Sequence, residues 1–266
     1  MVLGTQGWIP TGRRETTCLA LSGAGRLVLF DAGTGLRRLL EPPGATLLAE
    51  AEELHLVLTH YHLDHVCGLA YLPGILGGRE ITVHVPELAL SGVAPEAGVP
   101  ELIRRPFNPR AWSDLPNMRL VTIREGSNDI AGLTVRARRQ PHPDASVAYR
   151  VDDLFVFATD TVADPATAEF AAGVDLLLHE AWIDGVEEQE AAEAELVKAA
   201  YAAHSSARQA ASLALKAGVR DLWLTHLNPL RSEAYYAQME RSARTIFASA
   251  RVPTDLSHYD FCGRAR

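Results

Sequence analysis

LVLTHYHLDH, residues 56–65, joins a short apolar run to three histidines and an aspartate. Leu56, Val57 and Leu58 favour a buried β-strand, because they form a β-prone apolar run bounded by polar residues. Three imidazoles and a carboxylate crowded at one strand end would be costly to desolvate without a bound cation. The stretch therefore predicts a metal site at the C-terminal end of a strand.

The spacing inside this stretch divides its side chains into two sets. In an extended turn, residues two apart point to the same side, so His60 and His62 can meet one ion. Asp64 and His65 then turn toward a neighbouring position. Imidazole and carboxylate ligands without thiolate suit zinc, manganese or iron, and the spacing does not choose among them. One motif could serve two metals.

Further candidate ligands stand at the ends of later apolar or β-prone runs. They are His142 in RRQPHPDAS, Asp160 in FATDT and His226 in LTHLN. Each run would deliver its polar residue to a common edge of the fold, where active sites of α/β sheets commonly lie. We expect these three residues to join residues 56–65 in one site.

The chain as a whole is predicted to form one domain over residues 1–266, since this length can bury a large core. No stretch is apolar enough to cross a bilayer, and the N-terminus lacks the pattern of a secretory signal, so we expect a cytoplasmic protein with no membrane partner. Its three cysteines lie far apart, which favours neither disulfides nor a thiolate zinc site. The net charge of -8 argues against an extended nucleic-acid surface.

Strand-like runs alternate with turns and helical segments, which is typical of an α/β protein. Strands are expected at 17–21, 26–30, 54–58, 81–85, 119–123, 133–138, 147–151, 154–158, 174–178 and 221–225. The runs from 119 onward look antiparallel, apart from the last. Helices are expected at 34–40, 187–203, 206–217 and 232–249. Ser206 and Gln209 have capping-box spacing at the start of the third helix. The proline-rich residues 86–118 are expected to wrap over the surface or to form a lid.

The ordered ligand set resembles the metallo-β-lactamase fold superfamily, in its binuclear hydrolase branch, over nearly the whole chain. The resemblance implies an α/β fold, namely an αββα sandwich of two mixed β-sheets with outer helices. It also implies two divalent metal ions, with Zn²⁺ first and Mn²⁺ or Fe as alternatives. Position by position, the first metal would be bound by His60, His62 and His142, the second by Asp64, His65 and His226, and Asp160 would bridge them. A bridging water acidified toward about pH 7 would then be the nucleophile of a hydrolysis.

Two later segments, LLLHEAWID at 176–184 and AHSSARQAA at 203–211, resemble paired segments of ribonuclease Z and related phosphodiesterases. In that family a glutamate and a histidine relay a proton to the leaving oxygen, which implies catalytic roles for Glu180 and His204. The chemistry is sound, because an expelled alkoxide needs a proton and a carboxylate-held histidine can donate it. Asp64 is a further catalytic candidate, as acceptor of a proton from the attacking water.

The expected function is a metal-dependent hydrolase, a phosphodiesterase acting on a small phosphodiester or similar substrate. A tRNA 3′-processing endoribonuclease is one alternative, but Leu63 stands where that enzyme usually has glycine, and residues 86–118 are poor in basic residues. Hydrolysis of an acyl ester or lactone is a second alternative, in which the relay would be idle. A metal-loaded scaffold without activity is a third, and a homodimer is common in the resembled family.

Two interpretations stay open in the sequence. Asp31, in LFDAGTG, could orient a ligand histidine or could only form a turn. Arg136 and Arg138 share one strand face leading toward His142, where they could bind phosphate or simply face solvent.

Overall fold

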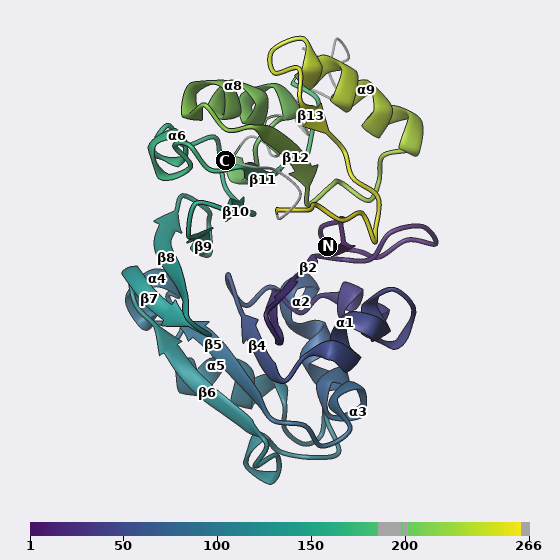
Figure 1. The fold of residues 1–266 in the computed structure, drawn as a ribbon, viewed down its shortest axis with the longest axis vertical. Helices are drawn as coiled ribbons and strands as arrows, with labels where there is room; N and C mark the ends of the chain where they lie inside the picture. Colours follow the sequence, from purple (N-terminus) through teal and green to yellow (C-terminus); the bar gives the residue numbers. More distant parts are fainter. Residues whose placement is uncertain (186–197, 199, 201, 262–266) are drawn as a thin grey trace.

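Two β-sheets form the centre of the molecule (Figure 1). The computed structural model describes residues 1–185, 198, 200 and 202–261, and within them one sheet has six strands and the other seven. The first sheet runs in chain order through β1 Val2–Gly4, β2 Cys18–Gly23, β3 Arg26–Phe30, β4 Glu53–Val57, β5 Ile81–Pro86 and β6 Met118–Ile123. The second runs through β7 Gly126–Ile130, β8 Leu133–Gln140, β9 Ser146–Val151, β10 Phe155–Ala158, β11 Leu176–Glu180, β12 Asp221–Thr225 and β13 Ala250–Arg251.

Both sheets are mixed. The pairs from β1 to β3 are antiparallel and those from β3 to β6 are parallel. In the second sheet the pairs from β7 to β10 are antiparallel and those from β10 to β13 are parallel. Together with the outer helices, this arrangement confirms the predicted αββα sandwich.

The prediction that the runs from 119 onward form an antiparallel set is wrong at its two ends. β6 pairs in parallel with β5 and belongs to the first sheet, and β11 pairs in parallel with β10. The second sheet instead begins at β7, whose polar sequence GSNDI did not predict a strand. Pairing between strands is a non-local property, so an apolar run identifies a strand without identifying its neighbour.

Alternation along the strands divides the core into layers. In β3, Val28 and Phe30 face the second sheet, whereas Leu27 and Leu29 face the outer helices. Phe30 meets the second sheet through Phe155, with ring centroids 5.4 Å apart in an edge-to-face arrangement. Burial on both faces explains why such strands are apolar at nearly every position.

Helices cover the outer face of each sheet, in separate halves of Figure 1. Those on the first sheet's side are η1 Thr34–Leu40, α1 Gly44–Glu50, α2 Leu63–Val66, η2 Cys67–Tyr71, α3 Leu72–Leu76, α4 Leu88–Ser91, α5 Pro95–Leu102 and η3 Trp112–Asp114. Those on the second are α6 Ala166–Phe170, α8 Ala207–Ala217 and α9 Glu233–Arg244. No helix among the described residues is long and apolar enough to cross a membrane.

The predicted helices fare differently. The capping box is present, since Ser206 Oγ accepts from Gln209 N–H and Gln209 Oε1 accepts from Ser206 N–H at the start of α8. α9 starts at the expected place but ends at Arg244, because the chain must turn back to pair β13 with β12. The helix expected at 187–203 lies for the most part outside the described residues.

The proline-rich residues 86–118 wrap over the outer face of the first sheet. Val99, Ile103 and Leu115 are buried in the core beneath that face, so the segment is anchored by apolar side chains between its prolines. Leu90, on α4, packs instead between the two sheets. This placement brings the residues after α4 close to the strand ends that carry the histidines.

Candidate metal centre

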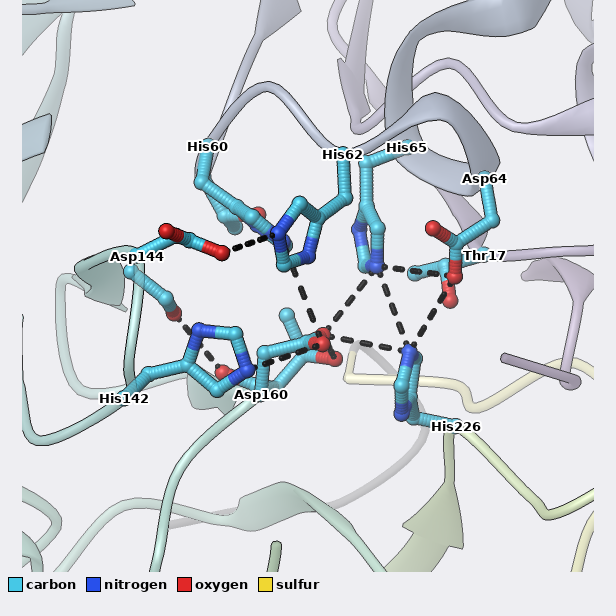
Figure 2. Close-up of polar contacts among 12 residues, drawn as sticks. Thr17, His60, His62, Asp64, His65, His142, Asp144, Asp160 and His226 are labelled. Carbon is cyan, nitrogen blue, oxygen red and sulfur yellow. Dashed lines mark hydrogen bonds and ion pairs between the residues drawn. The ribbon is translucent and has the colours of Figure 1, made fainter. Parts of the chain in front are cut away.

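Strand ends from both sheets meet at one edge of the sandwich and bring the candidate residues together (Figure 2). The loop after β4 and the start of α2 carry the first histidines and Asp64. The second sheet contributes the ends of β8, β10, β11 and β12, which supply His142, Asp160, Glu180 and His226. Every ligand expected from the sequence therefore lies in this one place.

The backbone is unusual just beyond three strands near the site, β3, β10 and β12. Asp31, Asp160 and His226 have φ angles of 60°, 49° and 49°, in the left-handed region that residues other than glycine rarely adopt. Each follows the C-terminal end of its strand by one or two residues. Strained backbone of this kind concentrates at functional sites, because the surrounding structure must enforce it.

Asp64, His65 and His226 form what we call the tight cluster. Asp64 Oδ2 lies 3.4 Å from Nε2 of both His65 and His226, and the two Nε2 atoms lie 3.3 Å apart. Asp160 Oδ2 completes the group at 3.1 Å from His65 Nε2 and 3.2 Å from His226 Nε2. Two tetrahedral ligands of one zinc ion stand about 3.3 Å apart, because each lies about 2.0 Å from the metal. Asp64, His65 and His226 are therefore spaced as ligands of one small cation, and Asp160 Oδ2 keeps a similar distance from both histidines.

His60, His62 and His142 form what we call the open cluster, on the other side of Asp160. Asp160 Oδ1 lies 3.9 Å from both His60 Nε2 and His142 Nε2. Ligand atoms of His62, His142 and Asp160 all lie within 4.8 Å of one another. His60 Nε2 is buried and has no hydrogen-bond partner among the described residues, which is costly unless a cation binds it. Asp160 thus turns one carboxylate oxygen toward each cluster.

Buried partners set the orientation of the histidines. Asp31 Oδ2 lies 2.8 Å from His65 Nδ1, and Asp31 is held in turn by the amide and hydroxyl of Thr59. The Thr59 hydroxyl also lies 3.0 Å from His60 Nδ1. With Nδ1 bound in this way, the Nε2 atoms of His65 and His60 face the site as ligands. Of the two interpretations left open for Asp31, the structure selects the orienting partner.

Asp144 is a site residue that sequence reasoning missed. Its Oδ2 lies 2.9 Å from His62 Nε2, and Figure 2 shows the carboxylate pointing at that ring. The contact leaves His62 Nδ1 as the nitrogen available to the open cluster. The only sequence signal was the position of Asp144 two residues after His142, which fixes no contact.

The charges of the site favour a cation. Burial alone would lower the pKa of His226, but the carboxylates of Asp160, Asp64 and Glu180 outweigh it and raise this pKa to about 10. Burial likewise opposes the charged form of Asp160, yet His226 and His65 hold the pKa of that carboxyl well below its usual range. The buried carboxylates thus stabilise positive charge at this point, whether imidazole protons or a metal ion carries it.

Glu180 and His204 form a hydrogen-bonded pair beside the two clusters. Glu180 Oε2 lies 2.8 Å from His204 Nδ1, while Oε1 accepts from the amides of Thr161 and Ser205. Trp182 stacks on the imidazole of His204, with ring centroids 4.5 Å apart and planes at 14°. Glu180 and Trp182 therefore fix the imidazole of His204 on two sides. Sequence reasoning paired His204 with Glu180 but did not include Trp182.

Arg136 and Arg138 do not reach the site. Arg138 pairs with Asp164 at 2.5 Å and donates to Thr167 Oγ1 at 2.9 Å, both near α6. The guanidinium of Arg136 lies over the Phe170 ring, 5.6 Å from its centroid. Both side chains thus serve the packing of α6 on the second sheet, so the structure gives them a role other than phosphate binding.

The fold and the clusters together define the class of protein, a metal-dependent hydrolase of the metallo-β-lactamase fold. Residues 26–227 match the protein family described as the beta-lactamase superfamily domain. This match spans well over half of the chain, and the chain belongs to that family.

Individual proteins extend this result. Ribonuclease Z of Haloarcula marismortui is 27% identical, over 92% of this chain and 90% of that protein. The solved structure of the metallo-beta-lactamase fold protein YhfI from Bacillus subtilis has a TM-score of 0.73 at 17% identity, over 96% of this chain and 95% of that chain. A diphosphatase from the PhnP family has a TM-score of 0.65 at 18% identity, over 96% and 94%. The predicted resemblance to the superfamily, in its ribonuclease Z and phosphodiesterase branch, is confirmed.

Proposed function

We propose that the chain is a binuclear phosphodiesterase that hydrolyses a small phosphodiester or similar substrate. The observation that carries the proposal is the Glu180–His204 pair, joined at 2.8 Å beside the ligand clusters. The His204 ring lies 5.9 Å from that of His142 and 5.7 Å from that of His226, between centroids. A proton donor in this position suits a reaction that expels an alkoxide, because the alkoxide leaves more easily when it is protonated.

The two ions are assigned to the open cluster and the tight cluster, with Asp160 as the shared ligand. This assignment is supported by the two oxygens of Asp160, one facing each cluster. Imidazole and carboxylate ligands without thiolate suit Zn²⁺, which we place first, with Mn²⁺ or Fe as alternatives. When bound, the two ions would supply a nucleophilic hydroxide at neutral pH and neutralise charge on the phosphoryl group.

The protein's own residues position and move protons. Asp64 is proposed to accept a proton from the attacking water, and its Oδ2 is held by the backbone N–H of Trp8 at 2.6 Å. Glu180 binds Nδ1 of His204, so that Nε2 can give its proton to the leaving oxygen. Trp182 keeps the imidazole plane fixed during this transfer.

Two alternatives use the same centre. The similarity to ribonuclease Z supports tRNA 3′ processing as the second candidate, which cleavage of a precursor tRNA would establish. Acyl ester or lactone hydrolysis is the third. Such a reaction also expels an alkoxide, so the reaction classes are discriminated by which substrate is turned over and not by dependence on His204.

The deciding experiment measures hydrolysis of bis(p-nitrophenyl) phosphate by protein with quantified metals. His62→Ala should abolish turnover with loss of bound metal. His204→Ala should retain both metals and lower kcat by about 10²–10⁴-fold for a diester that expels an alkoxide, but far less for bis(p-nitrophenyl) phosphate, because p-nitrophenolate leaves without being protonated. His258→Ala, at a distance from both clusters, is the matched histidine control and should keep wild-type turnover. Absence of turnover in a sample with two bound metals would reject the proposal and favour acyl or lactone substrates.

The setting of the protein is part of the proposal. We propose a single domain over residues 1–266, which is supported by the inter-sheet core to which both sheets contribute. We also propose a cytoplasmic homodimer. Sedimentation equilibrium on the purified protein tests the oligomeric state, and a monomer mass at all concentrations would refute the dimer.

A further inference from the structure

A pocket of about 440 Å³ opens beside His60 and His62, outside the ligand clusters. Residues 91–93, which follow α4, form one wall, and residues 143–145, which follow His142, form another. Tyr61 and Arg139 complete the lining. The volume falls within the range of about 300–1,000 Å³ that is usual for small-molecule sites. The pocket can therefore hold a substantial part of a substrate whose reacting group lies at the metals.

Arg139 reaches this pocket because of its place in β8. Arg139 is paired across the sheet with Val147, and Ala137, two residues earlier, is paired with Tyr149. Ala137, Val147 and Tyr149 all lie in the core between the two sheets, so Arg139 belongs to that face of the strand. Arg138 is paired with Ala148, which faces the outer helices. Alternation along the strand thus turns Arg139 to the side opposite Arg138, at the end of β8 nearest the site.

The guanidinium of Arg139 is exposed and uncommitted. Among the described residues it has no hydrogen bond or ion pair, in contrast to Arg138, whose guanidinium is bound by Asp164 and Thr167. The carboxylate lining the same pocket belongs to Asp144, which is already engaged by His62 at 2.9 Å. The pocket therefore presents a cation that no described partner neutralises, and such a group is a ready ligand for phosphate.

Tyr61 adds a second polar group without a partner. Its hydroxyl is buried and makes no hydrogen bond with any described residue. A tyrosine hydroxyl is an ordinary hydrogen-bond donor at neutral pH. A buried donor without an acceptor is costly. Tyr61 also lines the pocket, and its ring lies against Gly98 of α5.

We propose that this pocket is a substrate subsite in which Arg139 binds a second phosphate, carried on one arm of the phosphodiester that is cleaved. The inference rests on the proposed phosphodiesterase function and names its substrate class, a phosphodiester that carries a further phosphate. The reacting phosphate would lie against Asp160 and the two clusters, whereas the pocket shares only His60 and His62 with them. An anion bound by Arg139 therefore belongs to another part of the substrate.

The test compares three p-nitrophenyl diesters with the metal-loaded enzyme. They are thymidine 3′-(p-nitrophenyl phosphate), the same compound with a free 5′-phosphate, and the same compound with that 5′-phosphate esterified to a second nucleoside. Arg139→Ala should raise KM about tenfold for the substrates with a second phosphate, at unchanged kcat, and should not affect the first substrate. Arg139→Lys should recover part of the loss, because it keeps the charge without the fork of donors.

Arg136→Ala is the matched control, since it removes an arginine from the opposite face of the same strand, and it should leave all three KM values unchanged. A loss confined to the free 5′-phosphate would assign a mononucleotide-type substrate, and a loss confined to the esterified phosphate an oligonucleotide. Equal KM changes for all three substrates, or none, would overturn the inference while leaving the phosphodiesterase intact.

A binding measurement without turnover distinguishes failure of the Arg139 subsite from failure of the proposed phosphodiesterase function. Calorimetry compares thymidine 3′,5′-bisphosphate with thymidine 3′-phosphate and needs no turnover. Arg139→Ala should weaken the bisphosphate about tenfold and leave the monophosphate unchanged. If wild-type protein hydrolyses no diester, the proposed function fails, and an Arg139-dependent preference for the bisphosphate would still establish the subsite. The same affinity for both ligands would refute it.

Discussion

Replacing Asp31 with asparagine should weaken metal binding at the tight cluster. Asp31 is fully buried and accepts three contacts, from Thr59 N–H at 2.8 Å, from the Thr59 hydroxyl at 2.9 Å and from His65 Nδ1 at 2.8 Å. An asparagine of the same shape has one acceptor and one donor group. It cannot accept from both Thr59 and His65, so one of the two contacts becomes a clash between donors.

The loss of metal affinity follows from how the asparagine amide changes the protonation of His65. If the amide NH₂ faces His65, the ring must accept at Nδ1 and carry its proton on Nε2, the nitrogen that faces Asp64 and Asp160. A protonated Nε2 cannot bind a metal, and loss of such an orienting partner typically costs 10–100-fold in affinity. At about 1.4 kcal/mol per tenfold change, this corresponds to about 1.4–2.7 kcal/mol. The open cluster should be affected less, because Asp31 reaches His60 only through the Thr59 hydroxyl.

Competition with a chromophoric chelator measures the two affinities separately. Asp31→Asn should weaken one site by about 10–100-fold and the other by much less. Asp255→Asn is the matched control, because the Asp255 side chain is only 4% exposed and accepts from Thr5 N–H, the Thr5 hydroxyl and Glu15 N–H, and from no histidine of the two clusters. The control should lower stability without changing metal affinity. Unchanged affinity at both sites in Asp31→Asn would refute the reasoning.

Three further predictions follow from the same structure. A Cβ added at Gly7 would lie 2.5 Å from the His226 ring, so Gly7→Ala should weaken metal binding about tenfold in chelator competition. Gly12→Ala is the control, because an added Cβ there meets nothing within 4 Å and should leave the metal affinity unchanged. Equal metal affinities of the two variants would contradict the contact at Gly7. Removing the metals with a chelator should lower the Tm of the protein, and adding Zn²⁺ back should restore that Tm, because a ligand that binds only the folded state stabilises the folded state. A Tm that does not depend on metal would contradict the proposed metal centre. Ser232→Ala removes the side chain that accepts from Tyr235 N–H at the start of α9. Denaturant titration should show a free energy of unfolding lower by about 1 kcal/mol, at unchanged turnover. An unchanged denaturation midpoint would contradict the role of Ser232 as the helix cap.

Much of the site was predictable because its signals are local. Each ligand follows a short apolar run, and a strand that ends in a polar residue places that residue at the sheet edge whatever its neighbours are. The capping box at Ser206 was likewise visible, since both of its bonds join residues three apart. The pair of Glu180 and His204 was predicted from resemblance alone, because 24 residues separate them and no local pattern joins them.

Only the tertiary structure decided what depends on pairing between distant segments. The chain leaves the first sheet after β6 and enters the second at β7, whose polar sequence does not predict a strand, because sheet membership is set by hydrogen bonds to other strands. Asp144 became a partner of His62 across 82 residues, and the register of β8 against β9 turned Arg139 toward the site and Arg138 away. The sequence by itself indicated which residues gather at the site. Tertiary packing decided which partners orient them and which charge remains free, since both require contacts that no local pattern contains.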